Sequence, residues 1–177
     1  MSLFSGNKIL IFDECKFMAN LLFEIISSFE VGQLIVCNTL KDAKYYVNSM
    51  RFDCVFSDWN GWPEPELGLL QHIRYSGEAN DPSVPIIVFT AQTTIHSIIK
   101  ARDYGCSEVV TKPVSPSNVF DKIYASIFKN RQFIAVDSYT GPDRRRNSGN
   151  FNGIERRTDR SLQQAEIDSL LAGEVHE

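Results

Sequence analysis

The sequence lacks several features that mark other protein classes. No apolar run approaches the ~18 residues that a membrane-spanning helix needs, and no signal peptide opens the chain, so we expect a cytoplasmic protein without a membrane span. The four cysteines include no C-x-x-C pair, which argues against a zinc site or a disulfide framework. Cys37 and Cys54 lie in apolar runs, as small core residues of a reducing compartment do. No P-loop, nucleophile elbow or internal repeat is present, and we expect no independent enzyme activity.

Lysine is absent beyond residue 129, whereas seven of the ten arginines lie after residue 130. The formal net charge of −4 divides into −3 for residues 1–130, +3 for residues 131–160 and −4 for residues 161–177. This division predicts a mildly acidic globular domain over residues 7–130, an arginine-rich linker over residues 131–160 and an acidic end. A net charge of +3 over a linker supports only weak nonspecific binding to nucleic acid, so we expect no DNA partner.

Five short apolar runs are near-continuous rather than alternating, which is typical of strands buried on both faces of a parallel sheet. They cover residues 9–12, 34–36, 54–56, 86–89 and 109–110. Helical patterns follow each run, over residues 17–29, 40–50, 67–74, 95–101 and 119–128. The alternation predicts an α/β fold of (βα)5 type, a doubly wound three-layer sandwich with the flavodoxin-like strand order 2-1-3-4-5.

Polar side chains follow these strands at the edge where open α/β sheets bind ligands. Asp13 and Glu14 follow the first strand, Asp58 the third, Thr90 ends the fourth and Lys112 follows the fifth. Clustered carboxylates repel one another unless a cation joins them, and Mg²⁺ prefers such oxygen ligands. The pattern therefore predicts a Mg²⁺-dependent phosphoryl site in which Asp58 is the nucleophile. Thr90 and Lys112 would hold the remaining phosphoryl oxygens.

This constellation resembles the receiver domain of two-component response regulators, and within it the single-domain chemotaxis regulators of the CheY type. The resemblance covers roughly residues 7–130 and is carried by Asp58-Trp59-Asn60, Leu67, Leu69-Leu70, Ile73-Arg74, Thr90-Ala91 and Lys112-Pro113. It implies that a histidine kinase or phosphotransfer protein phosphorylates Asp58. It also implies that Asp13, Glu14 through water, Asp58 and the Asn60 carbonyl hold Mg²⁺, and that the Lys112–Pro113 peptide is often cis.

Two positions depart from the family pattern. Val109 stands three residues before Lys112, where the family normally has an aromatic switch residue. In the loop after Asp58 the usual proline is displaced by one, and Glu66 replaces the usual later glycine. An alternative is therefore a receiver that keeps the fold but signals without phosphorylation.

The arginine-rich segment favours planar, bidentate recognition, since lysine is excluded from it. Its two clusters are Gly141-Pro142-Asp143-Arg144-Arg145-Arg146 and Glu155-Arg156-Arg157-Thr158-Asp159-Arg160. Arginine forks suit guanine edges and phosphates, so cyclic di-GMP is one candidate ligand. A class of CheY-like flagellar proteins that bind this nucleotide through arginine-rich extensions is similar in layout. Docking to the acidic domain or to an acidic partner and solvated linker charge are the alternatives.

The acidic end contains a short amphipathic helix, expected over residues 161–173. Ser161 and Gln164 form a capping box, and Gly173 is a stop signal. Residues 162–171 resemble the N-terminal peptide of the flagellar switch protein FliM, which binds phosphorylated CheY on the face of helix 4, strand 5 and helix 5. The likeness implies a role in flagellar motor or chemotaxis control. The helix would dock on a receiver face, in its own chain or in a neighbour, or be presented to another CheY-like protein or the motor switch.

Overall fold

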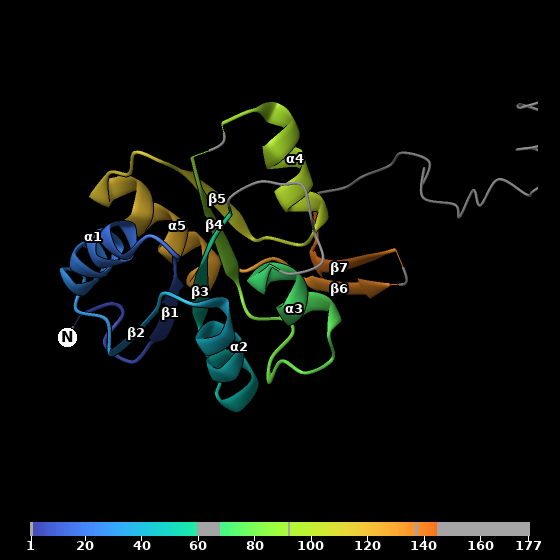
Figure 1. Cartoon of the computed structure of the whole chain (residues 1–177), viewed down its shortest axis with the longest axis horizontal. Helices are drawn as coiled ribbons and strands as arrows, with labels where there is room; N and C mark the ends of the chain where they lie inside the picture. The colour runs from blue at the N-terminus through green and yellow to red at the C-terminus, as the bar shows by residue number, and fades with distance from the viewer. Residues whose placement is uncertain (1, 60–67, 92, 137, 145–177) are drawn as a thin grey trace, which may run out of the picture. The chain divides into compact units, whose positions relative to one another are not determined.

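A five-stranded parallel sheet forms the centre of the fold (Figure 1). The computed structural model describes residues 2–59, 68–91, 93–136 and 138–144. The strand order is β2-β1-β3-β4-β5, which confirms the predicted order 2-1-3-4-5. The strands are β1 (Lys8–Phe12), β2 (Gln33–Cys37), β3 (Cys54–Asp58), β4 (Ile86–Thr90) and β5 (Glu108–Thr111).

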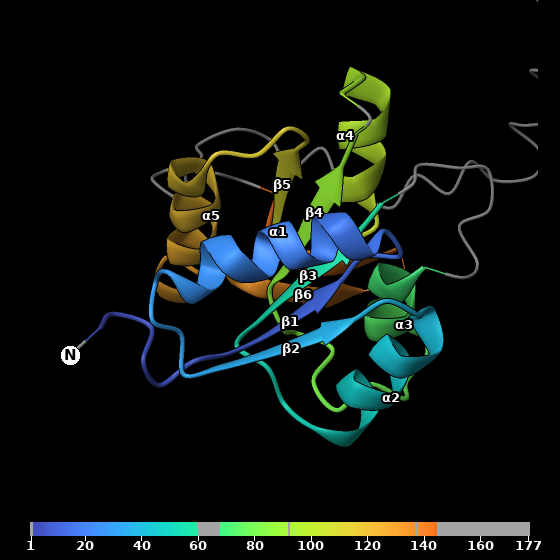
Figure 2. The same ribbon diagram turned by 60° about the vertical axis from the view of Figure 1, so that its left-hand side comes forward.

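Five helices cover the two faces of the sheet. They are α1 (Lys16–Ser27), α2 (Leu40–Ser49), α3 (Leu69–Tyr75), α4 (Ile95–Asp103) and α5 (Pro116–Phe128). Helices α1 and α5 pack on one face, whereas α2, α3 and the end of α4 pack on the other (Figure 1 and Figure 2). The fold is therefore the doubly wound, flavodoxin-like arrangement expected from the sequence.

Strand side chains alternate between two apolar clusters, which explains why the runs are apolar throughout. In β1, Ile9 and Ile11 join the cluster under α1 and α5, and Leu10 joins the cluster under α2 and α3. Cys37 and Cys54 are buried among them, as predicted, and all four cysteines are free thiols. The core thus aligns the strands so that their carboxyl ends meet.

The helix starts agree with local capping chemistry. The hydroxyl groups of Thr39, Thr94 and Ser115 accept hydrogen bonds from backbone N–H groups in the first turns of α2, α4 and α5. Each cap satisfies a donor that the helix itself leaves unpaired. Pro116 occupies the first turn of α5, where a missing N–H costs nothing.

An antiparallel hairpin follows α5 where the sequence analysis placed the start of a linker. Strands β6 (Phe133–Val136) and β7 (Tyr139–Pro142) pair with each other, and residues up to Arg144 belong to the same compact unit as the sheet. Gly141 and Pro142, residue types that are typical of turns, lie within β7. The linker assignment over residues 131–160 therefore begins too early. The hairpin is stable because Tyr139 is buried and its hydroxyl donates to the Pro142 carbonyl at 2.7 Å.

The expected tail helix over residues 161–173 and the arginines after Arg144 lie outside the described residues. Within the described ranges, no helix is long and apolar enough to cross a membrane.

Candidate functional site

Two aspartates and a lysine meet at the carboxyl ends of the central strands. Lys112 follows β5, and its Nζ donates to Asp13 Oδ2 and to Asp58 Oδ1, at 2.9 Å in each case. Asp13 follows β1, and Asp58 ends β3, the strand next to β1. These residues are up to 99 positions apart in the sequence, and the strand order brings them together as predicted.

The two carboxylates are almost fully removed from solvent. The Asp13 side chain is 0% exposed and that of Asp58 is 4% exposed, whereas Lys112 retains 16%. Asp13 Oδ1 accepts the Cys15 backbone N–H at 2.8 Å, which fixes its carboxylate beside the start of α1. Buried carboxylates are costly unless they are paired, and the single positive charge of Lys112 offsets part of the negative charge of two carboxylates that would otherwise repel each other.

Burial raises the pKa of Asp58 above its ordinary value, and the hydrogen bond from Lys112 offsets only part of this effect. Burial alone would lower the pKa of Lys112, but its hydrogen bonds to Asp58 and Asp13 raise it. Lys112 is therefore a cation at neutral pH. The site thus holds two carboxylates against one ammonium group, and such a site favours an added cation.

Mg²⁺ fits this donor set. It is commonly held by one or two carboxylates with several retained waters, and Asp13 and Asp58 supply two such carboxylates at one edge of the sheet. The Glu14 side chain is exposed, and Asn60 lies outside the described residues. Among the residues that the structure describes, no three His, Cys, Asp or Glu side chains form a metal cluster. Asp13 and Asp58 are thus the two buried carboxylates that the described site offers to the ion.

Thr90 ends β4, the strand beside β3, and is 2% exposed. Its hydroxyl donates to the backbone carbonyl of Trp59 at 2.9 Å. Its own carbonyl accepts the Lys112 backbone N–H at 2.8 Å, and the Lys112 Nζ lies 4.4 Å from the centre of the Phe89 ring. The Lys112–Pro113 peptide is cis. Thr90 therefore borders the aspartates, at the position predicted for a phosphoryl contact.

Arg144 is the one arginine proposed as a cyclic di-GMP ligand that falls within the described residues. Its Nη1 lies 3.3 Å from Asp103 Oδ1, and its guanidinium stacks 4.0 Å from the centre of the Tyr139 ring. Arg144 is thus engaged by its own domain. The other five arginines of this proposal, Arg145, Arg146, Arg156, Arg157 and Arg160, lie outside the described residues, so the nucleotide hypothesis rests on them.

Sequence reasoning did not predict that Arg74 is buried and packs against the hairpin. Arg74 of α3 donates from all three guanidinium nitrogens to the carbonyls of Gly105, Pro82 and Val84. The guanidinium also lies 5.4 Å from the centre of the Phe133 ring of β6. In the sequence, Arg74 is visible only as part of the Ile73-Arg74 motif and as a charged residue on the otherwise apolar face of a predicted helix, and neither signal predicts its burial.

A family model and several solved structures match the chain over this same region. The model of the response regulator receiver domain matches residues 9–124. The receiver domain of the Francisella response regulator 1452 is 20% identical with a TM-score of 0.60, over 70% of this chain and 98% of that chain. Chemotaxis protein CheY4 of Vibrio cholerae is 16% identical with a TM-score of 0.58, over 68% and 98%.

The receiver domain of the sensor histidine kinase PA1611 from Pseudomonas aeruginosa was solved with a magnesium ion in its active-site cleft. It is 19% identical with a TM-score of 0.58, over 69% of this chain and 98% of that chain. At such identities these structures show a common fold. The family model goes further, because it spans more than half of the chain and includes every strand that supplies a residue to the site. The chain therefore belongs to the receiver domain family of two-component response regulators.

Proposed function

We propose that this receiver accepts a phosphoryl group on Asp58 from a phosphorylated histidine of a kinase or phosphotransfer protein in the cytoplasm. The supporting observation is the Lys112 ammonium group, which lies 2.9 Å from carboxylate oxygens of both Asp13 and Asp58. A carboxylate oxygen of Asp58 attacks phosphorus while the phosphorus–nitrogen bond of phosphohistidine breaks, and the leaving imidazole takes up a proton. The chain is a phosphoryl acceptor in this proposal rather than an enzyme with a separate substrate.

The described side chains suit the charge that develops during such a transfer. Lys112 offsets the negative charge of the phosphoryl oxygens, and Thr90 offers a hydroxyl from the neighbouring strand. When bound to Asp13 and Asp58, Mg²⁺ supplies further charge neutralisation at the transferring group. Positioning and electrostatics then account for most of the rate, because phosphoryl transfer needs little other covalent chemistry from the protein.

Beryllofluoride, an analogue of a phosphoryl group, should bind to wild-type protein only in the presence of Mg²⁺. Fluorine NMR should show a bound signal that Asp58→Asn abolishes. A matched control is Asp53→Asn, because Asp53 is exposed and accepts the Lys8 backbone N–H at 2.7 Å, away from the site. Mg²⁺-independent binding, or binding that survives Asp58→Asn, would contradict the proposal. Absence of binding to wild type would favour a receiver that signals without phosphorylation.

We further propose that the tail resembling FliM binds a receiver face in flagellar motor or chemotaxis control. Support comes from α4, where Ile95 is 77% exposed and Ile98 and Ile99 are about 40% exposed. An amphipathic helix with Ile167, Leu170 and Leu171 on one face suits such an apolar surface. The partner would be the same chain, a second copy or another CheY-like protein.

Deleting residues 161–177 should change the rate of Asp58 phosphorylation by acetyl phosphate by about fivefold or alter the sedimentation profile, since a bound tail must favour one state of the domain. Ile95→Asp should produce the same change in the full-length chain, because it removes the most exposed apolar side chain of α4. An acidic residue in the first turn is compatible with the helix. An unchanged rate and sedimentation profile in both variants would exclude this role for the tail.

A further inference from the structure

Trp59 connects the phosphoacceptor residue to the end of α4. It directly follows Asp58, its backbone N–H donates to the Phe89 carbonyl at 3.1 Å, and its carbonyl accepts the Thr90 hydroxyl at 2.9 Å. Its indole ring lies 5.9 Å from the Tyr104 ring, between centroids, at an interplanar angle of 43°. One residue therefore contacts both the predicted phosphoryl ligand on β4 and an aromatic side chain at the end of α4.

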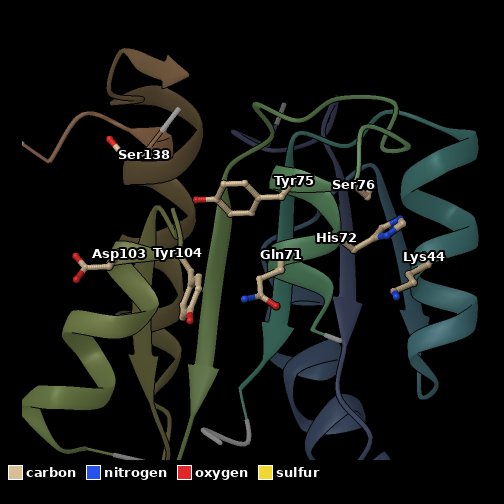
Figure 3. A pocket seen from close by; sticks show the side chains of 8 residues that line it. All are labelled: Lys44, Gln71, His72, Tyr75, Ser76, Asp103, Tyr104 and Ser138. Atoms are coloured by element: carbon tan, nitrogen blue, oxygen red, sulfur yellow. The ribbon is translucent and has the colours of Figure 1, made fainter. Parts of the chain in front are cut away.

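This aromatic pair borders open space. Tyr104 lines a groove of about 670 Å³ together with Gln71 and Tyr75 of α3 (Figure 3). Trp59 Nε1 and Gln71 Oε1 are buried without a hydrogen-bond partner among the described residues. Buried polar atoms are usually paired, so both side chains would gain from a different packing. The groove provides room for such a change beside Tyr104.

The end of α4 is tied to the hairpin on the other side of Tyr104. Asp103, the residue before Tyr104, pairs with Arg144 Nη1 at 3.3 Å, and the Asp103 carbonyl accepts from Arg144 Nη2 at 3.3 Å. Arg144 stacks on Tyr139 of β7. Gly105, the residue after Tyr104, has φ +90°, and a Cβ atom there would overlap the Thr140 carbonyl of β7. Both neighbours of Tyr104 therefore lie against the hairpin, Gly105 at β7 and Asp103 at Arg144, two residues after β7.

We propose that Tyr104 couples the state of Asp58 to the β6–β7 hairpin, in place of the aromatic side chain that Val109 does not supply on β5. The inference rests on the proposed phosphorylation of Asp58. A phosphoryl oxygen would compete with the Trp59 carbonyl for the Thr90 hydroxyl. Loss of that hydrogen bond releases Trp59, and its ring repacks against Tyr104 beside the groove. The hairpin, which precedes Arg144 and the arginines that follow it in the sequence, then responds to phosphorylation.

This coupling is tested by measuring the rates of amide hydrogen exchange in and beside β6 and β7, with and without beryllofluoride and Mg²⁺. In the wild type, addition should change the exchange rates of the Thr140 amide in β7 and of the Asp143 amide just after β7 by about fivefold, a typical size for coupled sites. Tyr104→Leu keeps an apolar side chain without a ring, and Tyr104→Ala removes most of the side chain. Both should bind beryllofluoride at Asp58 yet lose the hairpin response, whereas Tyr104→Phe should retain it.

The control is Tyr45→Ala, which removes an exposed tyrosine of α2 and should leave the response intact. The bound fluorine signal separates the two proposals: no signal in the wild type overturns the phosphoacceptor function itself. A bound signal with no change in the hairpin overturns the coupling. A hairpin response that persists in both Tyr104→Leu and Tyr104→Ala also overturns it, because the signal then travels by another route.

Discussion

Replacing Lys112 with methionine should slow phosphorylation of Asp58 by acetyl phosphate by about 10²–10³-fold, the usual cost of removing one preorganised charge from a transition state. Methionine keeps most of the apolar stem but cannot donate to Asp13 or Asp58, both of which accept from Lys112 at 2.9 Å. The rate is measured with saturating Mg²⁺. Lys122→Met is a matched control, because Lys122 pairs with Glu108 at 2.7 Å outside the site.

The same variant should change how stability depends on pH. Burial already raises the pKa of Asp58, and without Lys112 this pKa rises further because the compensating hydrogen bond is lost. A carboxyl group with a higher pKa in the folded than in the unfolded state binds protons on folding, so its contribution to stability grows as the pH falls. The free energy of unfolding of Lys112→Met should therefore rise as the pH is lowered from neutral toward the pKa of Asp58.

In the acetyl phosphate experiment, a phosphorylation rate of Lys112→Met within about threefold of wild type would contradict the assigned role of Lys112, since even one charge-assisted hydrogen bond is worth more.

Replacing Arg74 with methionine should lower the free energy of unfolding by about 3 kcal/mol, because three carbonyl groups, two of them in buried hydrogen bonds, lose a charged donor at once. Burial lowers the pKa of Arg74 to about 10, so the guanidinium is still charged at neutral pH. It donates to Gly105, Pro82 and Val84, and thereby joins α3 to the loops that precede β5 and β4. Urea denaturation measures the loss.

Arg51→Met provides the comparison for Arg74. Arg51 is exposed and donates to Asn80 at 3.2 Å, so its replacement should cost less than about 1 kcal/mol. A loss for Arg74→Met as small as that for Arg51→Met would show that the buried network contributes little. Weaker protection of β6 and β7 from hydrogen exchange should accompany the loss, because Phe133 packs over the Arg74 guanidinium.

The fold was predictable because each strand is an uninterrupted apolar run. The site was predictable because polar residues follow those runs: Asp13, Asp58, Thr90 and Lys112 all lie at the predicted edge. Local pattern and strand order together determine this arrangement, and neither depends on fine side-chain packing. The departure at Val109 was also visible in the sequence, although its structural consequence was not.

The hairpin could not be predicted in the same way. Its strands are four residues each, Gly141 and Pro142 are typical of a turn, and its support comes from distant partners. Arg74 and Gly105 contact it from positions that show no local relation to residues 133–142. The Trp59–Tyr104 contact likewise joins the residue after β3 to the residue after α4, which lie far apart in the sequence. Such contacts depend on tertiary geometry that neither periodicity nor motif spacing encodes.

Locating the phosphoryl group tests the central claim most directly. Full-length protein would be treated with acetyl phosphate and Mg²⁺, the acyl phosphate reduced with borohydride, and the modified residue identified by peptide mass spectrometry. The account predicts one modified aspartate, Asp58, and no modification in Asp58→Asn. Modification of Asp13 instead, or an unmodified wild-type chain beside a modified reference receiver, would contradict it.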